Sequence, residues 1–161
     1  MMITKVLKRS FATAGSLLTW GETTYGWGRE ISNDLRVPGR IENFNDVVGV
    51  CAGPYHLLFA RETKQIYSVG LGANGRLGHG NTNTLEFPEE IDELSKADVK
   101  RLAAGRRHSL ALTESGDVYA WGYGGRNSGI FKHFYFLRTD SPVGFGESGD
   151  ELRPRLVESL K

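Results

Sequence analysis

The chain has 161 residues, enough for one domain with a short extension, and its formal net charge at neutral pH is +1. The 21 glycines are about twice the usual share, which favours a turn-rich all-β chain. The balanced charge excludes a strongly basic nucleic-acid-binding protein, the single cysteine excludes an internal disulfide, and no apolar run approaches the ~20 residues of a membrane-spanning helix.

Residues 1–14, MMITKVLKRSFATA, differ in composition from everything that follows. They contain three basic residues and no acidic one, and small and hydroxyl-bearing residues complete the segment. On a helix, Ile3, Val6 and Leu7 would share one face, away from the basic residues. The composition predicts a mitochondrial presequence with cleavage after Phe11. An ordinary basic tail, or a segment that is retained and packed, is the alternative.

The rest of the chain contains a sequence that recurs. Its two fullest copies, CAGPYHLLFARETKQIYSVG at 51–70 and AAGRRHSLALTESGDVYAWG at 103–122, align with a constant offset of 52 residues. An earlier, partial copy is LLTWG at 17–21. A period near 50 residues is typical of a propeller or a solenoid array. The predicted repeats within 15–161 span approximately 15–44, 45–96 and 97–161.

The third repeat predicts short strands separated by turns. Residues 98–103 alternate between apolar and polar side chains, 108–113 are mostly apolar, and 117–121 are rich in β-branched and aromatic residues. Gly116 supplies a hairpin turn, and a Pro-x-x-Ile segment predicts a weaker fourth strand in the repeat. Four antiparallel strands per ~50 residues indicate a propeller blade. The recurring structural positions are Trp20, Gly21, Gly53, His56, Gly70, Gly105, His108, Trp121 and Gly122.

The sequence AAGRRHSLALTESGDVYAWG, and the GLGANGRLGHG that follows the second copy, resemble the repeat of the regulator of chromosome condensation family. The resemblance runs from about Leu17 to Gly129. It is partial in the first repeat, which lacks the Ala-Gly-x-x-His strand, and it weakens after Gly122 in the third. That family folds as a β-propeller, usually with seven blades. The resemblance therefore implies an all-β, partial β-propeller of about three blades, because at ~50 residues per blade this chain cannot close a propeller of that size.

Residues 130–149 form an aromatic insertion between the Gly-rich turn of the third repeat and its closing marker around Pro154. The insertion places five large apolar side chains within seven positions. One interpretation is a strand or helix inside the core of the blade, and the other is a surface that docks on a partner. The candidate partner-binding residues are Phe131, Phe134, Tyr135, Phe136 and Leu137.

No group of residues predicts catalysis, a cofactor or a metal. The G-x-G-x-x-G patterns at 70–75 and 144–149 lack the strand, helix and following acid of a dinucleotide site. His56 and His108 recur at one position and are expected to tie adjacent strands together, and the four histidines share no ligand spacing. Ser109 follows His108 directly, so the two alternate to opposite faces of a strand and form no catalytic pair.

We expect a non-catalytic structural or accessory subunit of a large mitochondrial assembly, of the respiratory-chain, ATP synthase or ribosome class, in the matrix or on the matrix side of the inner membrane. Open propeller ends expose strand edges and apolar faces, which other protein subunits would cover. The alternative, implied by the resemblance for some family members, is a regulator or assembly factor acting in guanine-nucleotide exchange on a small GTPase.

Nucleic acid is not an expected partner. Without the three basic residues of the first 14 positions, 17 basic residues face 19 acidic ones, which is not the charge of a nucleic-acid-binding surface. A local basic cluster remains, and it is interpreted as part of a solvated loop. Its members are Arg101, Arg106 and Arg107.

Overall fold

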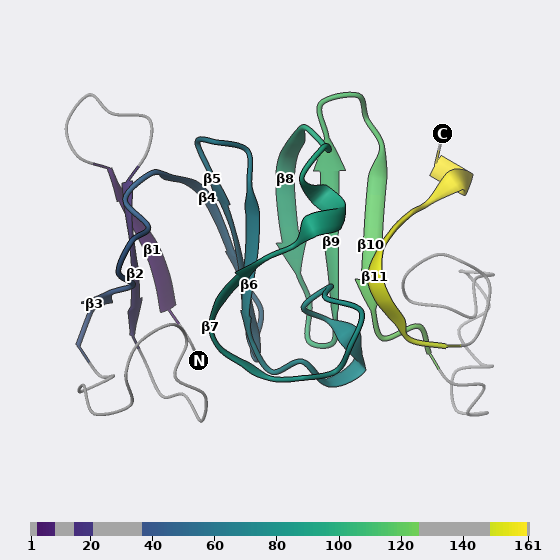
Figure 1. Cartoon of the computed structure of the whole chain (residues 1–161), viewed down its shortest axis with the longest axis horizontal. Coiled ribbons are helices and arrows are strands. Elements are labelled where there is room, and N and C mark those ends of the chain that lie inside the picture. The colour runs from purple at the N-terminus through teal and green to yellow at the C-terminus, as the bar shows by residue number, and fades with distance from the viewer. Residues whose placement is uncertain (1–2, 9–14, 21–36, 126–148, 161) are drawn as a thin grey trace.

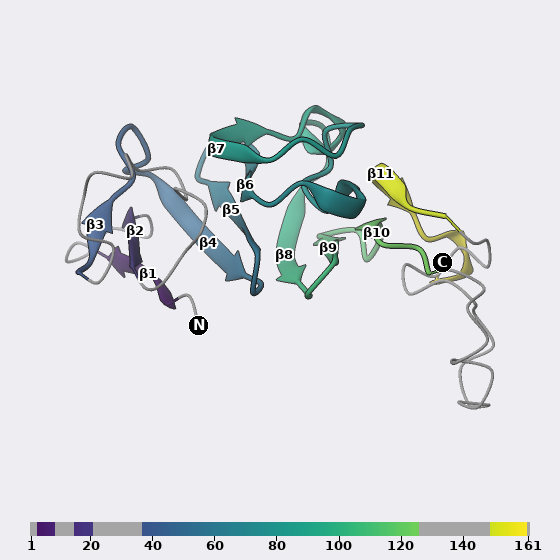
Figure 2. The same cartoon turned by 90° about the horizontal axis from the view of Figure 1, so that it is seen from below.

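The computed structural model describes residues 3–8, 15–20, 37–125 and 149–160, and within these ranges the chain is all-β (Figure 1). The strands form two hydrogen-bonded sheets, of seven and four strands. The larger sheet divides into two groups that are linked by the pairing of Gly15 with Val47, so three groups stand side by side in the order of the chain (Figure 1, Figure 2). Helical structure in the described residues is limited to 3₁₀ turns of three residues each. The strands are β1 (Ile3–Lys8), β2 (Gly15–Trp20), β3 (Gly39–Arg40), β4 (Val47–Ala52), β5 (His56–Arg61), β6 (Ile66–Gly70), β7 (Leu85–Glu90), β8 (Val99–Ala104), β9 (His108–Thr113), β10 (Val118–Gly122) and β11 (Glu151–Leu156).

The second and third groups are four-stranded antiparallel blades of the same construction. Blade 2 pairs β4, β5, β6 and β7 in that order, and blade 3 pairs β8, β9, β10 and β11. The ladders place Leu57 opposite Val69 in blade 2 and Ser109 opposite Trp121 in blade 3. The second pair lies 52 residues after the first. The repeat in the sequence is therefore the repeat of the strand register, as expected for propeller blades.

Blade 1 contains β1, β2 and β3 among the described residues. Strand β1 pairs with β2 along its whole length, from Ile3 opposite Trp20 to Lys8 opposite Gly15, and β3 also pairs with β2. In the repeat, Trp20 takes the position of Val69 in blade 2. Strand β1 therefore stands where β5 and β9 stand in the following blades.

Two expectations for the N-terminal segment are corrected by this pairing. The helical face is wrong for Ile3–Lys8, because these residues form a strand. Pairing with β2 satisfies backbone groups, whereas an isolated helix of this length is marginal in water. The first repeat also does not lack its second strand, because β1 supplies that strand without the Ala-Gly-x-x-His sequence. The presequence function itself stays a prediction.

The core lies in two apolar clusters between successive blades, and β5 contributes to both. Leu57 and Phe59 pack against blade 1, whereas Leu58 packs against blade 3. Successive side chains of a strand point to opposite faces, so a strand between two blades needs an unbroken apolar run. The buried residues are Leu17, Ile41, Val47, Leu57, Phe59 and Val69 in the first cluster, and Leu58, Ile66, Ile91, Leu94, Ala111 and Trp121 in the second.

An aromatic group adds to the first cluster. The Phe44 ring meets the Phe59 ring edge to face with centroids 4.9 Å apart, and Phe59 stacks on Tyr67 at 5.3 Å. The Arg61 guanidinium lies 5.6 Å from the Phe44 centroid, and its Nε donates to both carboxylate oxygens of Asp46 at 2.8 and 3.0 Å. Such edge-to-face and stacked pairs stabilise a core beyond the area that they bury. Blades 1 and 2 are therefore joined by apolar packing, while the Arg61–Asp46 ion pair lies within blade 2.

Trp121 is the largest fully buried side chain among the described residues. Trp121→Ala should lower the free energy of unfolding by about 3–5 kcal/mol, because it removes a packed indole. Urea denaturation followed by circular dichroism measures this. The control is Phe87→Ala, because Phe87 is 56% exposed and its loss should cost less than about 0.5 kcal/mol. Equal losses in the two variants would contradict the described packing.

Candidate functional site

Two loops of the same construction lie at one end of blades 2 and 3, each between the first two strands of its blade. In each Ala-Gly-x-x-His loop the glycine N–H donates to the histidine carbonyl at 2.9 Å, Gly53 to His56 and Gly105 to His108. A Cβ added to Gly53 would lie 2.3 Å from the Gly105 carbonyl oxygen. The two loops therefore touch across the blade boundary, and only glycine allows this approach.

An inter-blade network joins His56, Ser109, Trp121 and the carbonyl of Arg76. The Ser109 hydroxyl donates its one proton to the Arg76 oxygen at 2.8 Å, and Trp121 Nε1 donates to the same oxygen at 2.9 Å. Because that proton is used, Ser109 Oγ accepts from His56 Nε2, at 2.7 Å. His56 thus ties blade 2 to blade 3, across β5 and β9, rather than adjacent strands of one blade as predicted.

His56 is fully buried, and no described group bonds to its Nδ1 atom. Burial, together with the charges of Arg76 and His108, lowers the pKa of His56 from 6.5 to about 3. The imidazole is therefore neutral near pH 7, with its proton on Nε2. A neutral imidazole sealed from solvent acts as a structural donor.

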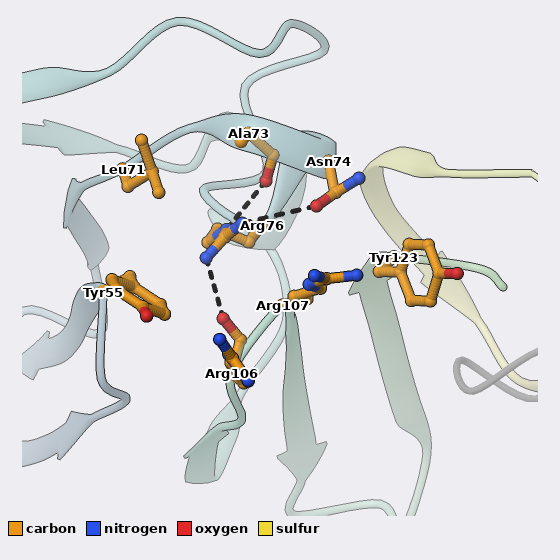
Figure 3. Close-up of a pocket in the computed structure, with 8 residues that line it drawn as sticks. All are labelled: Tyr55, Leu71, Ala73, Asn74, Arg76, Arg106, Arg107 and Tyr123. Carbon is orange, nitrogen blue, oxygen red and sulfur yellow. Dashed lines mark hydrogen bonds between the residues drawn. The ribbon is translucent and has the colours of Figure 1, made fainter.

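The side chain of Arg76 extends this network toward the loops at the end of the blades, although only 3% of the residue is exposed. Its Nε donates to the Ala73 carbonyl at 2.7 Å, and its Nη1 donates to the Arg106 carbonyl, also at 2.7 Å (Figure 3). Its Nη2 donates to the Asn74 side-chain oxygen at 3.3 Å. One guanidinium thus fixes the Gly-rich turn of blade 2 to the loop of blade 3.

Over this layer lies a cavity of about 480 Å³. The guanidinium carbons of Arg76 and Arg106 each lie 5.8 Å from the Tyr55 ring centroid, and that of Arg107 lies 5.3 Å from the Tyr123 centroid. These distances are those of cation–π contacts. We name it the arginine–tyrosine cavity, and its lining residues are Tyr55, Leu71, Ala73, Asn74, Arg76, Arg106, Arg107 and Tyr123 (Figure 3).

The cavity refines the interpretation of the arginine cluster. Arg106 and Arg107 are exposed loop residues, as expected, but they line a cavity, whereas Arg101 lies on β8 and does not. Sequence reasoning missed the two tyrosines of the cavity and Arg76. A signal was present, because Tyr55 and Arg107 both precede the histidine of the loop and are 52 residues apart. The variable positions of the repeat therefore gather on one face.

The other recurring positions lie in the blades. Gly70 and Gly122 end equivalent strands with φ of 118° and 103°, which favours glycine there. Val69 and Trp121 are fully buried, whereas Trp20 is half-buried. The predicted residues that lie outside the described ranges are Gly21 and the five of the aromatic insertion, Phe131, Phe134, Tyr135, Phe136 and Leu137.

His79, the other histidine of blade 2, forms the same kind of hydrogen bond to a serine as His56 does. Ser68 Oγ donates to the Leu77 carbonyl at 2.8 Å, so it accepts from His79 Nε2, at 2.7 Å. Across the described residues, no group of three or more His, Cys, Asp or Glu side chains could hold a metal ion. In the same ranges, the structure contains no helix with the length and hydropathy of a membrane span.

Two overlapping segments match the regulator of chromosome condensation (RCC1) repeat, residues 65–112 and residues 99–128. The human E3 ubiquitin-protein ligase HERC2 is 36% identical over 131 residues, which cover 80% of this chain and 3% of the ligase. The ultraviolet-B receptor UVR8 of Arabidopsis thaliana is 30% identical over 144 residues, which cover 88% of this chain and 30% of the receptor. The chain thus spans less than a third of either relative.

Solved structures give the same fold. Human WBSCR16 aligns with a TM-score of 0.72 and 24% identity, over 96% of this chain and 36% of that chain. Yeast RCC1 (Prp20), solved with Kap60, aligns with a TM-score of 0.68 and 20% identity, over 91% of this chain and 34% of that chain. These neighbours are RCC1-type β-propellers, so the predicted fold class, an all-β partial propeller of about three blades, is confirmed.

The low pKa of His56 predicts a pH dependence of stability. Between about pH 3 and 6.5 the unfolded chain binds a proton at this residue that the folded chain does not. The stability due to His56 is therefore complete above pH 6.5 and falls as the pH drops toward 3. From pH 6.5 to 4, the free energy of unfolding of wild type should fall more steeply than that of His56→Gln, by up to about 1.4 kcal/mol per pH unit.

Urea denaturation at several pH values measures both slopes. His79 and His108, whose pKa values burial also lowers, are present in both proteins, so the difference between the slopes reports His56. Parallel slopes for the two proteins would contradict the neutral, buried state of this imidazole.

Proposed function

The chain carries repeats of the regulator of chromosome condensation family, and from this premise we propose that it is a non-catalytic regulatory protein that acts by binding another protein. The observation that supports this most directly is the arginine–tyrosine cavity between blades 2 and 3. Arginine and tyrosine are the residue types enriched at the energetic centres of protein interfaces. The cavity concentrates three arginines and two tyrosines over a rigid layer.

The charge of the cavity specifies the partner surface. Among the residues that the structure describes, its lining contains three guanidinium groups and no carboxylate. A guanidinium forms forked, charge-assisted hydrogen bonds with anionic oxygen atoms, which fixes orientation as well as affinity. We therefore assign to the partner an acidic segment that enters between the loops of blades 2 and 3. A small GTPase is the partner class that the RCC1 repeats favour, with this chain as its regulator.

A second candidate function is an accessory subunit of a large mitochondrial assembly, supported by the basic composition of residues 1–14. Strand β1 lies inside that segment and pairs with β2 over six residues. Cleavage after Phe11 would remove β1 from blade 1. We therefore propose that the segment directs import and is retained in the folded protein.

The binding proposal predicts the effect of a double variant, Arg106→Gln with Arg107→Gln. Charged hydrogen bonds contribute about 1.5–3 kcal/mol each, so affinity for a purified partner recovered by crosslinking should fall at least roughly tenfold. Titration calorimetry with the full chain measures this, and nucleotide release tests any recovered GTPase. Arg101→Gln is the matched control, because Arg101 is exposed but lies outside the cavity. Unchanged affinity of the double variant would contradict the proposal.

The import proposal predicts the N-terminus of the mature protein. Peptides that contain Ile3–Lys8 should be recovered from the protein purified from mitochondria, because β1 belongs to blade 1. Mass spectrometry of N-terminal peptides measures this. The control is a chain with Lys5, Lys8 and Arg9 changed to Gln, which should not be imported and should remain outside mitochondria. A mature protein that begins at Ala12 would contradict retention.

A further inference from the structure

We propose that the arginine–tyrosine cavity binds a phosphomonoester group, carried by a phosphorylated side chain of the partner protein. The inference rests on the proposed function, since it names the chemistry by which that site recognises its partner. It is carried by the convergence of three guanidinium groups and two tyrosine rings on one cavity of about 480 Å³. A cavity of this volume lies within the range of ligand sites in proteins.

The positive charge of the cavity is held in place. Arg76 is bound to the carbonyls of Ala73 and Arg106, so its position is fixed before any ligand arrives. The side chains of Arg106 and Arg107 form no hydrogen bond or ion pair with the residues that the structure describes, and ring contacts orient them. Asp150 accepts from the Asn74 amide at 2.9 Å and is not part of the lining.

The ring contacts leave the hydrogen-bonding edges of Arg106 and Arg107 available. A guanidinium over an aromatic ring uses its flat face, whereas its five N–H groups lie in the plane of the group. Arg76 and Arg106 share the Tyr55 ring, and both belong to the lining of the cavity. Like charges repel, and an anion bound in the cavity would offset the repulsion among its arginines.

The charge of a phosphomonoester fits this site better than that of a single carboxylate. A phosphorylated side chain carries about −1.5 to −2 charges at pH 7 and three acceptor oxygens, whereas a carboxylate carries one charge and two oxygens. Three guanidinium groups can match the charge of the first ligand, and those of Arg106 and Arg107 can form forked contacts with it. Nucleic acid, the other common phosphate source, needs an extended basic surface, and the chain beyond its first 14 residues has more acidic than basic side chains.

The sequence repeat separates these residues from the framework. The loop of blade 2 has Pro54 and Tyr55 where the loop of blade 3 has Arg106 and Arg107. Both loops keep the same glycine–histidine hydrogen bond, so the two arginines are not needed to build the loop. They are a property of blade 3 alone, and they can be replaced while the blade is preserved.

The test uses the full chain and a fluorescent heptapeptide with one central phosphoserine among glycines and alanines. The matched probes are the same peptide with serine, the same peptide with glutamate, and a labelled single-stranded oligonucleotide. Fluorescence anisotropy should show the phosphopeptide binding at least roughly tenfold more tightly than the other three, and inorganic phosphate should displace it. Arg106→Gln and Arg107→Gln should each weaken phosphopeptide binding about tenfold or more. Arg101→Gln, at an exposed arginine outside the cavity, should leave it unchanged.

The outcomes separate the two proposals. Equal affinity for the glutamate and phosphoserine peptides, or for the oligonucleotide, overturns the phosphate assignment and leaves the protein-binding function standing. If the phosphopeptide does not bind, but the double arginine variant still binds its partner protein more weakly, the phosphate assignment is overturned and the protein-binding function again stands. Phosphopeptide binding that depends on Arg106 and Arg107, in a protein whose partner binding does not, overturns the proposed function and supports the anion site. Circular dichroism of each variant shows whether the blades are intact.

Discussion

The fold depends on one backbone oxygen, the carbonyl of Arg76, which accepts two hydrogen bonds from the next blade. Ser109 Oγ and Trp121 Nε1 donate to it at 2.8 and 2.9 Å, and both donors are fully buried. In a buried, low-dielectric setting such bonds are stronger than in water, and breaking one leaves a polar group unsatisfied. The turn between β6 and β7 of blade 2 is thus held by hydrogen bonds from blade 3. His56 extends the same network by donating to Ser109.

The same residue joins this framework to the exposed face. The carbonyl of Arg76 points into the inter-blade network, while its guanidinium holds the carbonyl of Arg106 and contributes to the arginine–tyrosine cavity. The framework positions are glycines, histidines and small or apolar residues, which tolerate little change because the loops touch through their backbones. The positions between them are exposed and differ between blades 2 and 3. Packing therefore determines the conformation of the loops, and the residues that differ between the blades determine which ligands the loops can bind.

The repeat was sufficient to predict the register of blades 2 and 3, because a fixed offset of 52 residues places equivalent pairs opposite each other in both ladders. Strand β1 could not be predicted in this way, because its sequence lacks the Ala-Gly-x-x-His pattern and its basic residues favour another interpretation. The cavity was missed for a different reason. Tyr55, Arg76 and Arg107 are distant in sequence, and only the contact of two blades brings them together. Local pattern predicts strands, whereas the site depends on how strands of different repeats pack.

Both stability and binding therefore belong to the boundary between blades. In a repeat fold each unit contacts only its neighbours, so stability is a sum of unit terms and boundary terms. His56 is buried and bonded across such a boundary, whereas the equivalent His108 is half-buried, although both loops have the same backbone hydrogen bond. The cavity is lined from both sides of the boundary that His56 helps to close. A ligand that contacts the turn of blade 2 and the loop of blade 3 at once must stabilise that boundary by mass action, since the cavity exists only when the two blades are docked.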